Sequence, residues 1–509
     1  MMKRFAILLA LSVLVSGFAM AQEGALTLTP LGTYETGLFD EGAAEIVTYD
    51  PVNQRAIVVN SGEGSSVDFL DISDPASPTL AFSVDMTVYG DGANGIAYAN
   101  GVVAVAVQAE AVDGAGVIAL LNADDGSEIG VAVAGVLPDM VGFTPDGSTV
   151  VSANEGEPSD DYSIDPEGSI TIVDVATLES TQVTFEGVEI PEGVRIFGPN
   201  ATPQQDLEPE YIAVSPDGTT AYVTLQENNA IAVVDIAAAE VTAIFPLGFK
   251  DYSLEENAID PSNEDGEIAI RPVPVFGMYQ PDAIATYEVD GAVYIVSANE
   301  GDARDYDTYS EEERIADITL DEEAFPNAAE LQEESNLGRL LITTTLGDTD
   351  GDGDFDELYN YGARSFSIWD AEGNLVFDSA GQFEAITAEL IPEAFNSQGA
   401  NESFDNRSDD KGPEPEAVVV GEVDGVPYAF IGLERVGGVM VYNVADPAAP
   451  EFVTYVNNNN PEGSAEEMTA GDIAPEGMIF VTAEDSPTGS ALLIVSNEVS
   501  GTTTIYGIE

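Results

Sequence analysis

The sequence predicts an all-β protein that forms a single β-propeller of about seven blades. Three observations support this prediction. Short segments rich in Val, Ile and Ala recur along the 509 residues, Asp-Gly pairs separate several of them, and one repeat unit occurs about seven times. A repeat fold of this kind can take up the whole length, which a typical globular protein would divide into about three domains.

Each repeat begins with a polar, usually acidic residue that opens a short apolar strand, and two further strands follow. The copies begin at Glu45, Asn94, Asp139, Glu210, Asp282, Glu416 and Glu476. Asp-Gly between the first two strands favours a hairpin turn, because glycine adopts positive φ at little cost. Continuous apolar runs are typical of strands covered on both faces, as in stacked blades.

The two ends of the chain fit a closed ring. The last copy stops after its third strand, residues 502–506, and an additional strand at residues 26–34 precedes the first copy. We expect the N-terminal strand to complete the last blade as its fourth strand, which would cover the open edges. The alternatives are an open solenoid and a pair of β-sandwiches.

Residues 1–21 have the pattern of a signal peptide, with Lys3 and Arg4, a short apolar run and Ala-Met-Ala at the expected cleavage site. We therefore expect a secreted protein, extracellular or periplasmic, with no transmembrane segment in the mature chain. The propeller is expected to occupy residues 22–509. Long insertions interrupt it near residues 188–207, 248–279, 302–362 and 388–413.

The charge is very negative, with 13 Lys and Arg against 93 Asp and Glu and a formal net charge of −80. Repulsion of phosphates by this charge excludes nucleic acid as a partner. A hydrophobic content of 44% still allows a substantial core. Two interpretations of the acidic excess remain open, namely a solvated surface adapted to high salt and a set of cation sites.

The chain contains no cysteine and no histidine. This composition excludes disulfides, Ser-His-Asp and Cys-His catalysis and ordinary zinc sites. Any catalysis would use carboxylates, hydroxyls, a few basic residues and metal ions with oxygen ligands. Whether the protein is an enzyme is therefore left open.

Acidic residues stand where first strands begin and second strands end, and in a propeller these positions share one face. If the topology holds, they converge on one mouth of the central channel, where oxygen ligands at high density favour calcium. The predicted ligands are Glu45, Asp139, Glu155, Glu210, Asp282, Glu300, Glu416, Glu434 and Glu476. The alternative is that they make turn and cap hydrogen bonds and bind no ion.

A second candidate calcium site is the acidic segment of residues 348–357. Its predicted ligands are Asp348, Asp350, Asp352, Asp354 and Asp356. Alternating Asp with Gly353 at the sixth position matches the first half of a calcium loop. The twelfth position is Tyr359 instead of Glu, so the segment is not a standard EF-hand. The alternative is a solvated acidic turn.

Several longer segments are shared with a known family. They include Ala-Asn-Glu-Gly at residues 153–156 and 298–301, and residues 274–282, 361–367 and 408–416. Together these segments resemble the choice-of-anchor I family of secreted propellers, whose animal relatives are called mesenchyme-specific cell surface glycoproteins. The resemblance implies a propeller fold and export. The family's looser similarity to calcium-dependent phytase and alkaline-phosphatase propellers suggests an enzymatic alternative.

The favoured hypothesis is a secreted calcium-binding β-propeller that acts as an extracellular recognition or adhesion module for an unknown extracellular ligand. The alternative is a calcium-dependent phosphoesterase, similar to alkaline phosphatase or phytase, in which bound calcium neutralises phosphate and activates water. In that alternative Arg364, Arg407 and Lys411 bind the phosphate. The sequence identifies no catalytic residues for it.

Overall fold

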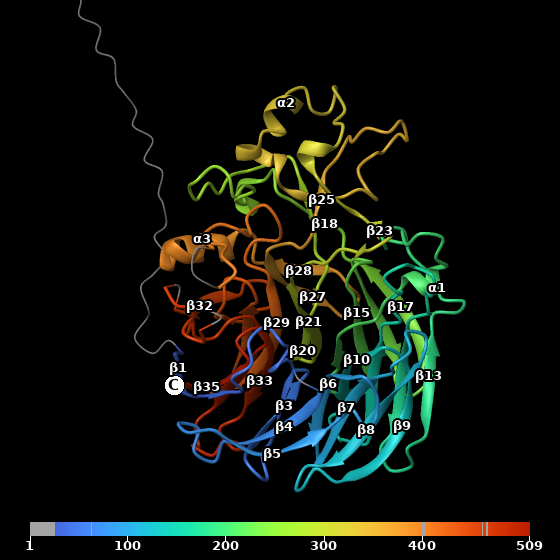
Figure 1. The fold of residues 1–509 in the computed structure, drawn as a ribbon, viewed down its shortest axis with the longest axis vertical. Helices are drawn as coiled ribbons and strands as arrows, with labels where there is room; N and C mark the ends of the chain where they lie inside the picture. The colour runs from blue at the N-terminus through green and yellow to red at the C-terminus, as the bar shows by residue number, and fades with distance from the viewer. Residues whose placement is uncertain (1–25, 63, 400–402, 461, 465–466) are drawn as a thin grey trace, which may run out of the picture.

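The computed structural model describes residues 26–62, 64–399, 403–460, 462–464 and 467–509. The predicted signal peptide, residues 1–21, lies outside this part of the chain. The described residues are mainly β-strand (Figure 1). Every helix among them is too short or too polar to cross a bilayer.

Within the described residues, seven four-stranded antiparallel sheets form the body of the molecule. Five of them use four consecutive strands. These strands are β2 (Val47–Asp50), β3 (Arg55–Asn60), β4 (Ser66–Asp71) and β5 (Thr79–Asp85); β6 (Gly92–Ala99), β7 (Val102–Gln108), β8 (Ala115–Asn122) and β9 (Glu128–Val136); β10 (Pro138–Phe143), β11 (Thr149–Asn154), β12 (Ser169–Asp174) and β13 (Ser180–Thr184); β14 (Ile212–Val214), β15 (Thr220–Leu225), β16 (Ala230–Asp235) and β17 (Glu240–Pro246); and β29 (Pro415–Val423), β30 (Val426–Leu433), β31 (Val439–Asn443) and β32 (Glu451–Val456).

The other two sheets combine strands that are distant in the sequence. One has the order β20 (Ile284–Val289), β21 (Ala292–Asn299), β27 (Ser365–Asp370) and β28 (Leu375–Asp378). The other joins both ends of the chain, in the order β33 (Pro475–Val481), β34 (Leu492–Asn497), β35 (Thr502–Ile508) and β1 (Leu28–Glu35). The pairing of β1 with β35 places Thr33 opposite Thr504, and their hydroxyl oxygens are 2.8 Å apart.

The first strands of the seven sheets contact one another in sequence order, and β2 also contacts β33. We call β2, β6, β10, β14, β20, β29 and β33 the inner strands. Apolar side chains fill the space between neighbouring sheets; Val151 and Ile170 of one sheet, for example, share a cluster with Val223 and Ala232 of the next. The sheets thus stack face to face around a common axis, which is the architecture of a β-propeller.

Local sequence explains the turns between the first two strands of several sheets. In the Pro-Asp-Gly turn after β10, Asp146 accepts a hydrogen bond from the Ser148 amide at 2.9 Å, and Gly147 has φ of +70°. The turn after β14 repeats this geometry at Asp217 and Gly218, where φ is +73°. Positive φ at this position favours glycine, so the sequence specifies these hairpins locally.

Two of the predicted insertions, residues 248–279 and 302–362, pack together as an inserted unit. It carries its own apolar core, which includes Tyr252, Ile315 and Leu340. Its elements are β18 (Phe249–Asp251), η1 (Glu255–Asn257), β19 (Phe276–Met278), β22 (Asp305–Tyr306), β23 (Tyr309–Ser310), β24 (Glu312–Arg314), η2 (Ile315–Asp317), α2 (Ala328–Leu331), the π-helical turn η3 (Glu334–Gly338), β25 (Leu341–Thr343) and β26 (Tyr359–Asn360). The unit projects from the side of the sheets that also carries α1 (Pro203–Asp206) and α3 (Gln382–Leu390) (Figure 1). The short turn η4 (Pro392–Ala394) follows α3 in the sequence.

Candidate functional site

Acidic side chains line a cavity of about 260 Å³ at one end of the channel between the inner strands. We call this cavity the acidic mouth. Its acidic lining residues are Glu45, Asp139, Asp282, Glu476 and Glu498. The first four were predicted from their positions at the beginnings of first strands, and the structure brings them together. Glu498, which follows β34, was not among the predicted ligands.

Burial is the main reason that these carboxyl groups hold protons more tightly than usual. It raises the pKa of Glu45 and of Asp139 to about 7 in each case, and neighbouring carboxylates add to the effect. The pKa of Glu476 is raised well above its ordinary value for the same reasons. In the absence of a cation, part of the mouth is therefore protonated near neutral pH.

Five carboxylates beside and within the mouth form what we call the Glu416 cluster. They make two groups, Asp282 with Glu416 and Glu476, and Glu300 with Glu416 and Glu434. Within each group, one oxygen from each side chain lies within 4.8 Å of the others. Glu416 is common to both groups, and burial raises its pKa well above the ordinary value. Burial also raises the pKa of Glu300 to about 7 and that of Glu434 to about 8.

A second set of carboxylates, the Glu227 cluster, comprises Glu155, Glu208, Glu210 and Glu227. Glu155 follows β11, Glu210 precedes β14, and Glu227 follows β15. Burial raises the pKa of each of the four, and repulsion between members of the cluster adds to the increase for Glu155 and Glu210. Glu155 and Glu210 were among the predicted ligands. Glu227 was expected at the mouth as a residue at the end of a second strand but was not predicted as a ligand, and Glu208 was missed.

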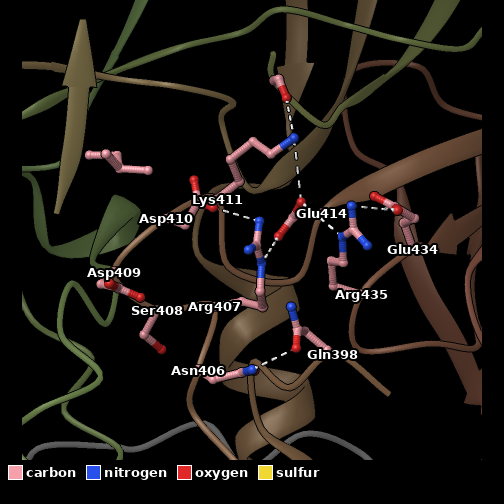
Figure 2. A network of polar contacts seen from close by, with 12 residues as sticks. Gln398, Asn406, Arg407, Ser408, Asp409, Asp410, Lys411, Glu414, Glu434 and Arg435 are labelled. Carbon is pink, nitrogen blue, oxygen red and sulfur yellow. Dashed lines mark hydrogen bonds and ion pairs between the residues drawn. The ribbon is translucent and has the colours of Figure 1, made fainter. Parts of the chain in front are cut away.

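Basic residues that follow α3 in the sequence neutralise part of this face (Figure 2). The Oε1 atom of Glu414 accepts a hydrogen bond from Arg407 Nε at 2.6 Å, and its Oε2 atom lies 3.4 Å from Lys411 Nζ. Lys411 also forms an ion pair with Glu300, and Arg435 pairs with Glu434 at 3.0 Å. Although burial acts in the opposite direction, Lys411 and Arg407 hold the pKa of Glu414 below its ordinary value.

The three residues assigned to phosphate in the phosphoesterase alternative all form ion pairs inside the chain. Arg364 is buried and pairs with Glu384 at 2.6 Å. Its guanidinium also donates to the backbone oxygens of Asp260, Ser408 and Asp410 at 2.7–2.8 Å. Arg407 pairs with Glu414, and Lys411 pairs with Glu300 of the Glu416 cluster.

The predicted Asp-rich segment forms a loop on the inserted unit, and we call residues 348–357 the Asp loop. Asp348 accepts hydrogen bonds from the amides of Gly351 at 2.8 Å and Gly353 at 3.1 Å. Two groups of carboxylates share Asp356, one with Asp348 and Asp350 and the other with Asp321 and Asp354. Asp352 belongs to neither group. Asp321 lies outside the acidic run, so its participation depends on the fold of the inserted unit.

A second cavity, of about 470 Å³, lies between the same inner strands. It is lined mainly by apolar side chains such as Val141, Val418 and Phe480. Tyr211, Ile46 and Met140 line both this cavity and the acidic mouth. The channel is thus acidic where first strands begin and apolar further along them.

The fold and the site together define a β-propeller with a carboxylate-lined mouth. The chain belongs to the choice-of-anchor I family, because the model of the choice-of-anchor I domain matches residues 45–447. This match confirms the resemblance found in the sequence.

Two curated relatives are similar over part of the chain. Gigasin-3a of Magallana gigas is 28% identical over 202 residues, which cover 35% of this chain and 66% of that protein. The mesenchyme-specific cell surface glycoprotein of Strongylocentrotus purpuratus is 30% identical over 283 residues, covering 49% of this chain and 36% of that protein. The chain therefore matches just under two thirds of the first relative's length and about a third of the second's.

Solved structures with a similar arrangement have little sequence identity. Kuenenia stuttgartiensis hydrazine synthase aligns with a TM-score of 0.47 at 13% identity, covering 93% of this chain and 98% of that one. The β-propeller domain of Myceliophteria thermophila Cps50 (Swd1) aligns with a TM-score of 0.44 at 8% identity, covering 94% of this chain and 99% of that one. A chain of the mitotic checkpoint complex aligns with a TM-score of 0.47 at 8% identity, covering 99% of this chain and 98% of that one.

Proposed function

We propose that the chain is an extracellular calcium-binding β-propeller that acts as a recognition or adhesion module. The observation that carries the proposal is the Glu416 cluster, in which two groups of carboxylates share one buried glutamate. A cation held by Glu416 would bridge first strands of neighbouring sheets. The mouth would then be rigid and less negative, as a ligand-binding surface requires.

The chemistry of the site favours calcium. Without histidine or cysteine, the chain offers a metal ion oxygen ligands almost exclusively. Calcium binds six to eight oxygens at about 2.3–2.6 Å, so two of its ligands lie at most about 5 Å apart. The oxygens of each group lie within 4.8 Å of one another, which is compatible with a shared calcium ion. Water would complete the coordination.

Two observations support an extracellular location. The first residues have the pattern of a signal peptide. In addition, one of the relatives is named a cell surface glycoprotein, and the aligned part covers about half of this chain. The extracellular medium also supplies millimolar calcium, which is the range in which extracellular calcium sites commonly work.

The propeller itself is proposed to be a closed ring of seven blades, one for each four-stranded sheet. The pairing of β1 with β35 and the contact between β2 and β33 support closure, because they connect the first repeat to the last. In a closed ring the acidic residues at the beginnings of the inner strands would face one shared channel. Closure therefore makes a common cation site possible.

Replacing the shared ligand by Glu416→Gln is expected to weaken calcium binding at the mouth at least tenfold. Glutamine keeps the size of the side chain but lacks the negative charge that attracts the ion. Isothermal titration calorimetry at pH 8 and constant high salt would measure the change. The matched control is Glu422→Gln, an exposed position on the same strand β29. Equal binding by wild type and Glu416→Gln would contradict the proposal.

The phosphoesterase alternative makes a different prediction for the same proteins. It requires calcium-dependent hydrolysis of phosphomonoesters by the wild-type chain, with loss of turnover in Glu416→Gln and Asp282→Asn. Internal ion pairs already occupy the three proposed phosphate ligands, Arg364, Arg407 and Lys411. The phosphoesterase alternative therefore has less support than a recognition module that binds calcium without catalysis. Observed turnover that depends on these carboxylates would favour the enzyme.

The Asp loop is proposed as a separate calcium site on the inserted unit. Because Asp356 belongs to both groups of carboxylates there, Asp356→Asn is expected to remove bound calcium from the loop and leave the mouth unaffected. Equilibrium dialysis would show a lower number of bound ions. Asp352→Asn serves as the control, since Asp352 lies in the loop but in neither group. Equal losses in the two variants would contradict this assignment.

A further inference from the structure

The apolar cavity of about 470 Å³ contains none of the carboxylates of the proposed calcium sites. Each of the seven inner strands contributes residues to its lining. None of the described residues that line it is charged, although charged residues make up 21% of the chain. Its volume and its apolar lining are typical of small-molecule sites, which measure about 300–1,000 Å³.

The acidic mouth adjoins this apolar cavity, because Ile46, Met140 and Tyr211 line both. All three residues are partly buried. Burial raises the pKa of Tyr211, and the charges of Asp282 and Glu476 add to the increase, so the Tyr211 hydroxyl lies near the carboxylates. The two cavities together therefore offer an acidic end and an apolar body, with an aromatic ring at their junction.

Glu45 and Asp139 line the mouth and lie outside both carboxylate groups of the Glu416 cluster. Glu45 accepts a hydrogen bond from Ser61 at 2.7 Å. Among the described residues, neither Glu45 nor Asp139 forms an ion pair with a basic side chain, and no basic residue lines the mouth. Arg435, which acts on the adjoining Glu498, is paired with Glu434. A cationic group of a ligand would supply the missing positive charge.

We propose that this channel binds a small ligand that has an ammonium group and an apolar body. The ammonium group would lie at the mouth near Glu45 and Asp139, with the Tyr211 ring as a further contact for the cation. The apolar body would fill the larger cavity and displace water from its lining. The same carboxylates would repel an anionic end group. The inference rests on the proposed function, because it gives a ligand class to the recognition role.

Isothermal titration calorimetry with hexylammonium tests the inference at pH 8 in constant salt and calcium. The comparison ligands are methylammonium, which lacks the apolar body, hexanol, which lacks the charge, and hexanoate, which has the opposite charge. Each buried methylene adds about fourfold to the affinity. Hexylammonium is therefore expected to bind at least tenfold more tightly than any of the three. Absence of binding, or an affinity no higher than that of any one of them, would overturn the inference.

The variant Asp139→Asn is expected to weaken hexylammonium binding at least tenfold and to keep the calcium binding that Glu416→Gln removes. The matched control is Glu422→Gln, which removes one negative charge at an exposed position of β29. It is expected to bind hexylammonium as wild type does. If Asp139→Asn also binds hexylammonium as wild type does, the ammonium group does not lie at the mouth and the inference is wrong.

A second measurement does not depend on a variant. Crystals of the wild-type chain soaked in 6-bromohexylammonium are expected to show the anomalous peak of bromine in the apolar cavity, beside residues such as Val141 and Val418. Absence of a peak there would also overturn the inference.

The two proposals fail in different ways. If Glu416→Gln loses calcium but hexylammonium binds no more tightly than methylammonium, only the ligand class is wrong. If Glu416→Gln binds calcium as wild type does, the calcium site of the proposed function fails instead.

Discussion

Calcium is expected to raise the melting temperature of this protein more strongly at pH 8 than at pH 5. Near pH 5 buried carboxyl groups of the acidic mouth and of the Glu416 cluster are protonated. Their pKa values reach about 7 for Glu45, Asp139 and Glu300 and about 8 for Glu434. Calcium must displace these protons to bind. At pH 8 little or no such competition remains for the groups with pKa values near 7.

The sign of the pH dependence without calcium follows from the same values. The pKa of these groups in the folded state lies above the unfolded value of about 4–4.5. The folded state therefore binds more protons, and the free energy of unfolding falls as pH rises from about 4.5 to about 8. Calcium reverses this loss, since each occupied site adds about 2.7 kcal/mol when free calcium is 100-fold above its dissociation constant.

Differential scanning calorimetry with calcium or with a chelator would measure both effects. About 1 M sodium chloride in all samples reduces the Debye length to about 3 Å, which screens repulsion across the acidic surface. A calcium effect that remains under these conditions is specific to sites, so the experiment also separates cation binding from adaptation to high salt. The same calcium-induced shift at pH 5 and pH 8 would contradict the proposed mouth site.

Local patterns in the sequence predicted much of the fold. Short apolar runs and Pro-Asp-Gly turns such as residues 145–147 specify strands and hairpins through neighbouring residues alone. The convergence of Glu45, Asp139, Asp282 and Glu476 was predicted as well, because propeller topology places the beginnings of first strands on one face. Whether these residues bind an ion stays a prediction.

The sequence did not predict features that depend on distant partners. The inserted unit builds one core from two segments that β20 and β21 separate. Asp321 joins the Asp loop only through that packing. Glu208 was missed although one signal was present, namely the repeated Glu-Pro-Glu at residues 208–210 and 414–416. Comparing the two copies would have directed attention to it.

Arg364 illustrates the same limit, and its replacement is expected to have the largest effect on stability. The sequence suggested a phosphate ligand, but the structure shows a guanidinium that is buried and bound to Glu384 and to three backbone oxygens. Arg364→Met would leave the Glu384 carboxylate buried without its counter-ion. Breaking a buried ion pair from one side costs about 3–5 kcal/mol, measurable by urea denaturation at constant salt.

Two further variants separate a structural role of Arg364 from a role in phosphate binding. The double variant Arg364→Met/Glu384→Gln is expected to recover part of the lost stability, because no unpaired charge remains buried. Arg339→Met is the control, since the Arg339 side chain is 35% exposed and its ion pair with Asp409 is worth at most about 1 kcal/mol. If Arg364→Met unfolds at the same urea concentration as wild type, the guanidinium is not a structural element, and a ligand-binding role becomes the better explanation.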